Sequence, residues 1–444
     1  MPLLNKAKLK TLVLALIAAS ASNTMFAADK QLLDILLGNG AITQQQYDEL
    51  LAKEELTVED ANDIVVDFGE GSGVNVSTRD GQFEFDIGGR LHLDYAQHEN
   101  VPGLGVTPIN GFTTRRARLE MEGMFSGVWG WAAEIDFAEN VVEIKDFKIG
   151  YEGDNFSLYG GHQKQPYSLS LEMSSNDIPW IERSIDNYLV AELTDRSVGV
   201  RLETSGDNWF FAGGVFGEEP DSGTQGDEYV ATMGRIVYAP IMDDDKTLHL
   251  GLRGAYRSNK DVREFRARDR TTDFSGLRIV DTGVIADAES IVMYGPELGL
   301  AVGPLTVLGE YSTVTVNRSL NPDVDLKAWH LGAALSLTGD TRATSYRIDA
   351  GEFKGVRASR PFDPASGQWG GLELVARYAE VDFDDGTFIG GTEDVFNAGV
   401  NWYPTRNVRF LFDWTHILDT DKSNTVRSLA PDLDVWTVRA QYNY

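Results

Sequence analysis

The final eleven residues of the chain, Asp434 to Tyr444, read DVWTVRAQYNY. In an extended strand, successive side chains point to opposite faces, so alternate residues share a face. One face of this stretch is apolar and the other is polar: Trp436, Val438, Ala440, Tyr442 and Tyr444 stand against Thr437, Arg439, Gln441 and Asn443. An uncovered apolar strand face promotes aggregation in water, so we expect something to cover it, and lipid is one candidate.

The same two-residue period recurs along most of the chain after Gln82. It is clear in the stretches 83–95, 248–257 and 329–337, where apolar residues alternate with polar ones. A membrane barrel needs this pattern, because its strands face lipid on one side and water on the other. A soluble β-sandwich also alternates, but its apolar faces look inward and it seldom has so many long strands with aromatic ends.

We predict about sixteen strands, which begin near residues 83, 113, 129, 143, 156, 197, 208, 229, 247, 290, 305, 326, 370, 392, 407 and 434. Some gaps between them are short, as at Gly303-Pro304, and others are long, as at 260–289 and 340–368. Short turns at one end and long loops at the other are typical of an outer-membrane barrel. The predicted fold class is therefore an all-β, transmembrane antiparallel barrel, in which Tyr444 ends the closing strand at a membrane interface.

Bulk composition excludes several other classes of protein. Mean hydropathy is only -0.24, and beyond the N-terminus no segment approaches the roughly 18 apolar residues of a membrane-spanning helix. The chain has no cysteine, which removes thiolate metal sites and cysteine nucleophiles. Its net charge of -29 argues against a nucleic-acid partner, because phosphate-binding surfaces are normally basic.

The N-terminal region differs from the rest of the chain. Residues 1–27 combine lysines with a short apolar run and indicate a signal peptide. Residues 28–60 have a helical period broken at Gly38-Asn39-Gly40 and predict a short periplasmic helical hairpin. Residues 61–80 are acidic with interspersed glycine and predict a linker, so the barrel is expected to occupy residues 81–444.

Catalytic signatures are missing from the sequence. It contains no His-Glu-x-x-His, no Gly-x-Ser-x-Gly and no phosphate-binding glycine loop, so we expect no enzyme, metal site or cofactor. His92, His249 and His330 fall in the lumen phase of their strands, where we interpret them as polar lining.

The lumen phase of the predicted strands is rich in cationic side chains: Arg90, Arg116, Arg118, Lys148, Arg201, Arg235, Arg253, Arg257, Arg377, Arg409 and Arg439. Guanidinium groups in an aqueous pore attract anions such as phosphate and carboxylate. Carboxylates share the same phase, including Glu84, Asp86, Asp94, Glu120, Glu122 and Asp413, so the charges could instead form cross-strand pairs. A further basic group, Arg263, Arg266, Arg268 and Arg270, lies in a long loop that either narrows the channel or faces solvent.

The sequence resembles the phosphate- and polyphosphate-selective porin family, porin O/P. The matching stretches include LLDILLGNGAITQQQYDELL, TRRARLEMEGMF, LYGGHQKQPYSL, WIERS, FRARDR and GVNWYPTRNVRF, and with others they cover nearly all of the chain after the signal peptide. The resemblance implies a trimeric, sixteen-stranded porin in which infolded loops and a ladder of arginines pass anions.

The resemblance also implies roles for individual residues. Arg115, Arg116 and Arg118 match the family's basic strand, Lys164 the lysine before its proline, Arg183 the arginine of its Glu-Arg-Ser, and Arg266 and Arg268 its basic loop. Two features depart from the family pattern: Asp269-Arg270 replaces Pro-Glu, and the region 166–196 is rich in acid. They concern the preference for phosphate and leave the porin assignment unchanged.

Several functional hypotheses follow. The first is a passive, anion-preferring outer-membrane channel, with membrane lipid, small anions such as phosphate and two further copies of the chain as partners. The alternatives are a structural or adhesive barrel with a plugged pore, and a general or cation-preferring porin. An energy-coupled transporter would need a larger plug domain than the residues before the barrel provide.

Overall fold

The computed structural model describes residues 37, 43, 44, 47, 64–68, 73–99, 108–217, 229–259, 263–268, 279–421 and 433–444. The predicted signal peptide, 1–27, lies outside the described residues. So does the predicted helical hairpin, 28–60, apart from four single residues. Within the described part of the chain, no helix has the length and hydropathy needed to cross a membrane.

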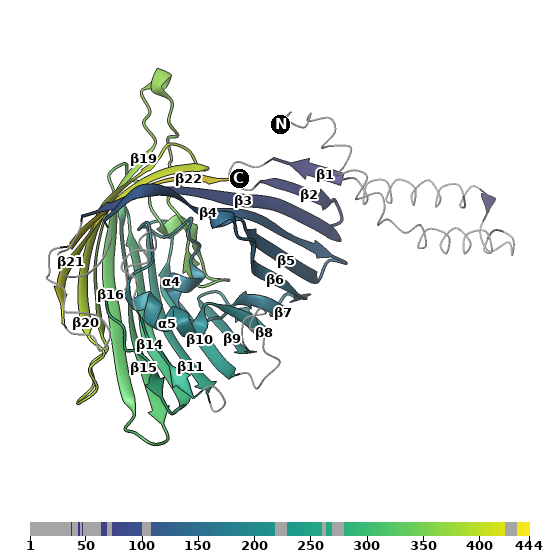
Figure 1. Cartoon of the computed structure of the whole chain (residues 1–444). Coiled ribbons are helices and arrows are strands. Elements are labelled where there is room, and N and C mark those ends of the chain that lie inside the picture. The colour runs from purple at the N-terminus through teal and green to yellow at the C-terminus, as the bar shows by residue number, and fades with distance from the viewer. Residues whose placement is uncertain are drawn as a thin grey trace. The chain divides into compact units, whose positions relative to one another are not determined.

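Sixteen antiparallel strands of the described chain form one closed barrel (Figure 1). They are β3 (Phe83–His98), β4 (Ile109–Phe125), β5 (Trp129–Asp136), β6 (Glu143–Glu152), β7 (Ser157–Lys164), β8 (Arg196–Ser205), β9 (Trp209–Phe216), β10 (Val230–Met242), β11 (Lys246–Ser258), β14 (Ala288–Val302), β15 (Leu305–Arg318), β16 (Val324–Ser336), β19 (Gly371–Asp382), β20 (Thr392–Tyr403), β21 (Val408–Thr420) and β22 (Leu433–Asn443). Each strand pairs with the next, and β22 pairs with β3 to close the barrel. All sixteen begin within four residues of their predicted starts, so the predicted barrel is confirmed.

The segment 61–80, which we predicted as a linker, contains two short strands, β1 (Ile64–Asp67) and β2 (Val74–Thr78). β2 pairs with β3 from Val74, opposite Ile87, onward. The linker interpretation is therefore wrong for the β2 half of the segment. The composition is acidic and glycine-bearing, but the short alternation in VNVST is sufficient for a strand.

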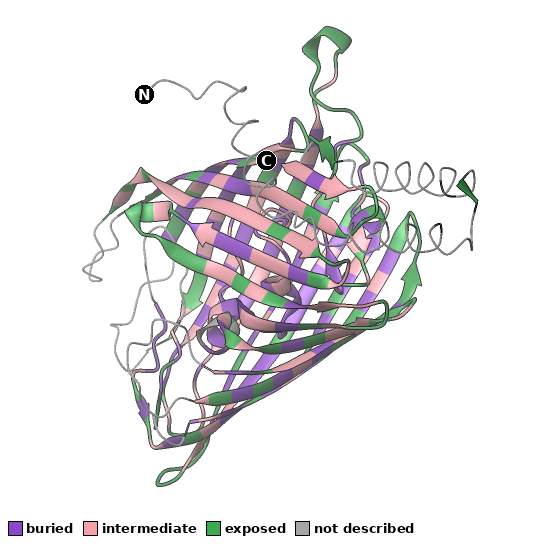
Figure 2. Cartoon of the chain, turned by 90° about the vertical axis from the view of Figure 1, so that its right-hand side faces the viewer, coloured by how far each residue is buried: buried purple, intermediate pink, exposed green. Residues whose placement is uncertain are grey.

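The degree of burial alternates along the barrel strands (Figure 2), because successive side chains point to opposite faces. In β22, Trp436 and Tyr442 are 43% and 46% exposed on the outer face, whereas Arg439 is 1% exposed on the inner face. At the end of this strand the Gly89 N–H donates to the Tyr444 main-chain oxygen at 2.8 Å, and the Tyr444 N–H donates to the Gly89 carbonyl at 3.0 Å. Closure thus pairs the backbone of the last strand on both sides.

The two ends of the barrel carry different connections. We call the end where β3 begins and β22 ends the turn end, and the opposite end the loop end. Most turn-end connections are short, and the long connection 259–287 joins β11 to β14 at the loop end. The expected asymmetry fails for 337–370, because β16 runs toward the turn end and β19 starts there (Figure 1). This long connection therefore lies among the short turns.

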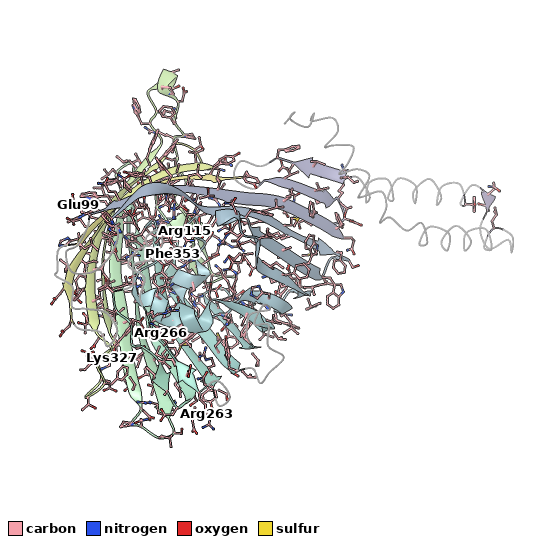
Figure 3. All side chains as sticks on the ribbon, viewed as in Figure 1. Glu99, Arg115, Arg263, Arg266, Lys327 and Phe353 are labelled. Carbon is pink, nitrogen blue, oxygen red and sulfur yellow. The ribbon has the colours of Figure 1, made fainter. Side chains whose placement is uncertain are left out.

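Three segments fold into the barrel. The first, 165–195, contains α4 (Leu169–Glu172) and α5 (Asp186–Thr194); the second, 339–358, contains η2 (Ala343–Ser345), β17 (Tyr346–Arg347) and β18 (Glu352–Phe353); the third contains β12 (Glu264–Phe265) and β13 (Ile285–Ala286). Two further short helices of residues 64–444 as described, η1 (Ala138–Asn140) and η3 (Pro364–Ser366), lie in connections outside these segments. Phe353 of the second segment is fully buried, with its ring 6.1 Å from that of His249 on the barrel wall (Figure 3).

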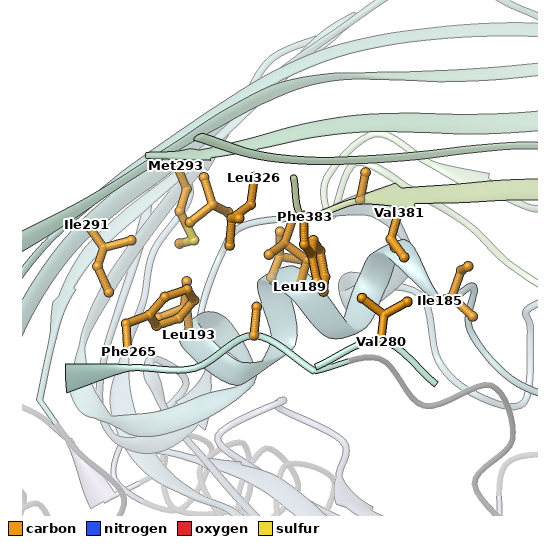
Figure 4. Close-up of a cluster of buried hydrophobic side chains, with 14 of the residues drawn as sticks. Ile185, Leu189, Leu193, Phe265, Val280, Ile291, Met293, Leu326, Val381 and Phe383 are labelled. Carbon is orange, nitrogen blue, oxygen red and sulfur yellow. The ribbon is translucent and has the colours of Figure 1, made fainter. Parts of the chain in front are cut away.

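The main hydrophobic core lies inside the barrel. Leu189 and Leu193 of α5 pack with Phe265 of the third segment and with wall residues such as Leu326 and Val381 (Figure 4). Burial of these side chains holds the first and third segments against β14–β19. The part of the lumen next to β3–β8 is left for charged side chains.

We predict that deleting Tyr442 to Tyr444 prevents stable assembly of the barrel. The deletion removes the ladder between the end of β22 and Leu91, Arg90 and Gly89, and so leaves polar backbone groups unpaired at the edge of the barrel. The measurement is the fraction of heat-resistant folded barrel on a denaturing gel. Tyr444→Phe is the matched control, because it keeps the ring and backbone and should assemble normally; full assembly of the truncated chain would contradict the prediction.

Candidate functional site

A cavity of about 800 Å³ lies between the β3–β8 wall and the infolded segments. Ten basic and ten acidic side chains line it: Arg90, Arg115, Arg116, Arg118, Lys145, Lys148, Lys164, Arg183, Arg196 and Lys354, and Glu122, Glu134, Asp136, Glu139, Glu143, Asp146, Glu172, Glu182, Asp195 and Glu352. Although the numbers of basic and acidic side chains are equal, the cavity need not be electrostatically neutral for an ion. Charges that are already paired with each other attract a permeating ion less than unpaired charges do.

A bulge in β4 brings two adjacent arginines to the same side of the wall. The register shifts between the pairs His92–Arg116 and Leu93–Thr114, so Arg115 has no opposite residue. Both Arg115 and Arg116 then reach Glu182 of the first infolded segment, at 3.0 and 3.5 Å. Strict alternation would have pointed Arg115 outward.

Glu182 also forms an ion pair with a third arginine, Arg439 of the closing strand β22. Arg439 Nη2 lies 2.5 Å from Glu182 Oε1, and its Nε bonds Asp94 at 2.7 Å. Burial alone would raise the pKa of Glu182, but the positive charges of Arg115, Arg116 and Arg439 outweigh burial and hold the pKa well below its usual range. Glu182 is therefore ionised, and it fixes the first infolded segment to the wall.

Several other carboxylates that line the cavity are also held in ion pairs. Arg118 pairs with both Glu134 and Asp136, the latter at 2.7 Å. Arg196 bonds Asp146 at 3.1 Å. Glu172 accepts from Arg201 at 3.0 Å. These contacts neutralise much of the negative charge that lines the cavity.

Three of the lining cations contact no carboxylate in the described chain. Lys164 donates to the Glu172 carbonyl at 2.9 Å. Arg183 donates to the Ser170 and Met173 carbonyls at 2.6 and 2.8 Å. Lys148 lies 4.6 Å from the centre of the Tyr159 ring. Carbonyl and ring contacts do not neutralise a positive charge as a carboxylate does, so these three groups can attract an anion.

The second infolded segment contributes Glu352 and Lys354, which form an ion pair with Nζ and Oε1 at 2.6 Å. Burial raises the pKa of Glu352, although Lys354 and Lys164 act in the opposite direction. The Gly355 N–H donates to Asp177 of the first infolded segment at 2.8 Å, so the two segments meet beside the cavity.

The three histidines that we interpreted as polar lining hold the infolded segments. His92 bonds Asn176 at 2.9 Å, and His330 bonds Asp186 at 2.8 Å, both in the first segment. His249 bonds the Tyr346 hydroxyl of the second segment at 2.8 Å. Within the described chain, no group of three or more His, Asp or Glu side chains has the arrangement of a metal site.

Six of the twelve predicted site residues line the cavity: Arg90, Arg116, Arg118, Lys148, Lys164 and Arg183. The structure places the other six, Arg253, Arg257, Arg263, Arg266, Arg268 and Arg377, away from its walls. Arg253 and Arg377 are examples of cations that are instead held by other groups inside the barrel. Arg253 is enclosed by Glu310, Ser312 and the Tyr167 ring, and Arg377 bonds Asn397 and lies 4.8 Å from the Trp180 ring.

The basic loop also lies apart from the cavity. Arg266 bonds Asp281 at 2.7 Å, and Arg268 forms a backbone bridge with the same residue. Phe265 and Ala267, on either side of Arg266, pack into the core around α5, and this packing turns the loop toward the filled side of the barrel. Arg263 and Arg257 lie on this filled side of the barrel as well. The guanidinium carbon of Arg257 is 4.3 Å from the centre of the Tyr229 ring.

Strand alternation did not identify four of the lining cations: Arg115, which only the family resemblance named, and Lys145, Arg196 and Lys354. Arg115 lies at the β4 bulge and so departs from the strand alternation. Lys354 reaches the cavity from a segment that is far away in the sequence. Lys145 lies at the loop end of β6, where its Nζ is 2.5 Å from Oε1 of Glu143, two residues earlier. Only Arg196, which begins β8 directly after the first infolded segment, carried a usable signal.

A second cavity, of about 520 Å³, has a different charge balance and shares Glu122 and Lys148 with the first. Its walls include residues of the turn-end connections, such as Asp154 and Asn155. Seven carboxylates line it, Glu84, Asp86, Glu122, Glu152, Asp154, Glu203 and Asp349, against Lys148 and Arg347. We call this second cavity, which lies next to the turn-end connections and adjoins the first cavity, the acidic vestibule.

Comparison with known proteins supports this reading of the fold and site. A family model described as "Phosphate-selective porin O and P" matches residues 85–444. Porin O of Pseudomonas aeruginosa is 24% identical over 423 residues, which cover 86% of this chain and 93% of Porin O.

Two solved structures share the fold. OmpT of Vibrio cholerae superposes with a TM-score of 0.54 at 11% identity over 82% of this chain and 98% of OmpT, and OmpT has also been solved in a trimer form. The anion-selective porin from Comamonas acidovorans superposes with a TM-score of 0.51 at 12% identity, over 82% of this chain and all of the porin. With its closed barrel and charged cavity, the chain belongs to the phosphate-selective porin O and P family, and it is a porin of the bacterial outer membrane.

Proposed function

We propose that the cavity of about 800 Å³ is the constriction of a passive, water-filled channel that prefers small anions of the phosphate type. The observation that carries the proposal is the pairing pattern. The carboxylates Glu134, Glu182 and Asp146 are held by arginines, whereas Lys164 and Arg183 have no carboxylate partner among the described residues. A permeating anion can therefore bind these cations without displacing an existing ion pair.

The known proteins are consistent with this preference. The matching family is described as phosphate-selective, and one porin of the same fold is described as anion-selective. We further propose that the outer face contacts membrane lipid and that three copies assemble. Exposed outward residues such as Leu252, at 62%, and Ile236, at 52%, suit a lipid environment, and the trimer form of OmpT supports a homotrimer.

Two other functions make different demands on the structure. A plugged structural or adhesive barrel needs the infolded segments to fill the lumen, and the large cavity favours a channel instead. A general or cation-preferring porin is favoured by the acidic vestibule, where seven carboxylates face two cations. Reversal potentials across reconstituted membranes separate the anion and cation preferences.

The double variant Lys148→Glu, Lys164→Glu should lower the anion-to-cation permeability ratio strongly. Both substitutions reverse charges in a confined passage, where screening is weak. Raising the salt from about 0.1 M to 1 M shortens the screening length from roughly 10 Å to 3 Å, so the difference from the unsubstituted chain should shrink. Arg266→Glu is the control, since Arg266 bonds Asp281 away from the cavity; a larger effect from Arg266→Glu would show that the basic loop forms the constriction.

Selectivity should also depend on pH through Glu352. The raised pKa means that Glu352 loses its negative charge, as the pH falls, before an ordinary glutamate with a pKa of about 4.3 does. The cavity then becomes more positive, so the anion-to-cation ratio should rise as the pH falls from neutrality toward 5. Glu352→Gln should remove this rise and Glu139→Gln, which changes another lining carboxylate, should keep it; an identical pH dependence in both variants would assign the effect to another group.

Glu182→Gln should destabilise the folded barrel by about 3–5 kcal/mol, the usual cost of removing one partner from a buried ion pair. Arg115, Arg116 and Arg439 would lose the carboxylate that they share. The measurement is the midpoint of denaturant unfolding in detergent. Glu139→Gln serves again as the control, because Glu139 is exposed on η1; equal midpoints for the two variants would mean that the cluster adds no stability.

A further inference from the structure

An aromatic hairpin at the turn end plays no part in the channel described above. Residues 360–370 follow the second infolded segment, carry η3 at their tip and lead into β19. Asp363 and Gln368 pair through two backbone hydrogen bonds of 3.0 and 2.9 Å. The hairpin projects from the turn end of the barrel, above β19 in Figure 1.

The base of the hairpin is stacked on the barrel. The Phe362 ring lies 5.7 Å from the ring of Trp369 and 5.7 Å from that of Trp402 on β20. Trp402 in turn stacks on Phe410 of β21 at 5.4 Å. The indole N–H of Trp402 donates to the Trp369 carbonyl at 2.6 Å, and the Phe362 N–H donates to the Pro404 carbonyl at 2.7 Å. The hairpin therefore continues an aromatic row that begins on the barrel wall.

This row belongs to the outer face of the barrel. Asn401 and Arg409 point inward, because both donate to the Pro179 carbonyl of the first infolded segment, at 2.7 and 3.0 Å. Side chains alternate along a strand, so the next residues, Trp402 and Phe410, point outward. Phe362 and Trp369 extend this outward row beyond the end of the wall.

Both rings of the hairpin are exposed. Trp369 is 69% exposed and Phe362 is 37% exposed. Arg360, at the start of the hairpin, is exposed, and so is Arg357, three residues before it. Asp363, Ser366 and Gln368 make the region of the tip polar. Aromatic rings with nearby arginines and a polar tip form the arrangement found where a membrane protein crosses from hydrocarbon to headgroups.

We propose that residues 360–370 lie in the interfacial region of the lipid bilayer, with Phe362 and Trp369 among the headgroups and the η3 tip in water. The proposal rests on the lipid contact of the outer face proposed above. Continuity with the outward row of Trp402 and Phe410 selects lipid as the occupant of this surface. The contact anchors the second half of a connection whose first half brings Glu352 and Lys354 to the channel.

The test uses site-directed spin labels in the full chain, reconstituted in vesicles of phosphatidylethanolamine and phosphatidylglycerol. The sequence has no cysteine, so each introduced cysteine is the only labelling site. The measurement compares collisions of the label with oxygen, which concentrates in lipid, and with a neutral nickel chelate, which stays in water. Labels are placed at Trp369→Cys and at Ser366→Cys on the tip.

Two further labels calibrate the comparison. Leu252→Cys, on the outward face of β11, reports lipid, and Leu320→Cys, in the loop-end turn where Leu320 is 86% exposed, reports water. If the label at 252 shows no oxygen preference, the barrel is not inserted and the proposed lipid contact of the outer face fails. A failure of the hairpin proposal alone would instead show an oxygen preference at 252 and none at 369.

The expected result is an oxygen-to-nickel ratio at 369 that exceeds the ratio at 320 several-fold, with a ratio at 366 close to that at 320. A ratio at 369 equal to that at 320 would place the hairpin in water and overturn the proposal. Low access of both reagents at 369 would mean that protein, such as a second copy of the chain, covers the rings, and it would also overturn the proposal. If Trp369→Cys does not assemble, a label at Gln368→Cys with Trp369 intact makes the same comparison.

Discussion

The structure depends on one constraint: in hydrocarbon, every backbone N–H and C=O must find a partner within the protein. The pairing of β22 with β3 satisfies this constraint for the last open edges of the sheet, down to the two hydrogen bonds between Gly89 and Tyr444. Once the barrel is closed, the outer face is free to be apolar and the inner face is free to be charged. The two-residue period of the sequence follows directly from this division.

The inner face is organised by ion pairs that join wall to infolded segment. Glu182, from the segment 165–195, reaches arginines of β4 and β22, and Glu172 of the same segment reaches Arg201 of β8. These contacts fix the segment, and they also remove carboxylates from competition with permeating ions. A chain with a net charge of -29 can therefore present an anion-attracting constriction, because the sum of the charges does not describe where they lie.

The sequence allowed the barrel to be predicted strand by strand, since the period of two is a property of each strand alone. It also identified inward cations such as Arg118 and Lys148, which follow strict alternation. Alternation did not identify Arg115, because the β4 bulge adds one residue and so changes which face Arg115 points to. Lys354 reaches the cavity because the second infolded segment meets the first, through the hydrogen bond between Gly355 and Asp177. The basic loop around Arg266 is turned away from the cavity because Phe265 and Ala267 pack into the core around α5. No local sequence pattern records either contact.

The position of the connection 337–370 could have been worked out from the sequence. With sixteen strands in order, the parity of each strand fixes the end at which it stops, so β16 and β19 must be joined at the turn end. Loop length alone suggested the opposite end. The direction of the flanking strands therefore predicts the end of the barrel at which a connection lies better than the length of the connection does.

The central claim is that an open channel with an anion-preferring constriction runs through this barrel. Its most direct test is the reversal potential of the unsubstituted protein in a planar bilayer under a KCl gradient. The account predicts discrete conductance steps and a reversal potential of the sign set by chloride. A reversal potential of the sign set by potassium would show that the acidic vestibule governs selectivity, and the absence of any conductance would show that the infolded segments close the pore; either result would contradict the account.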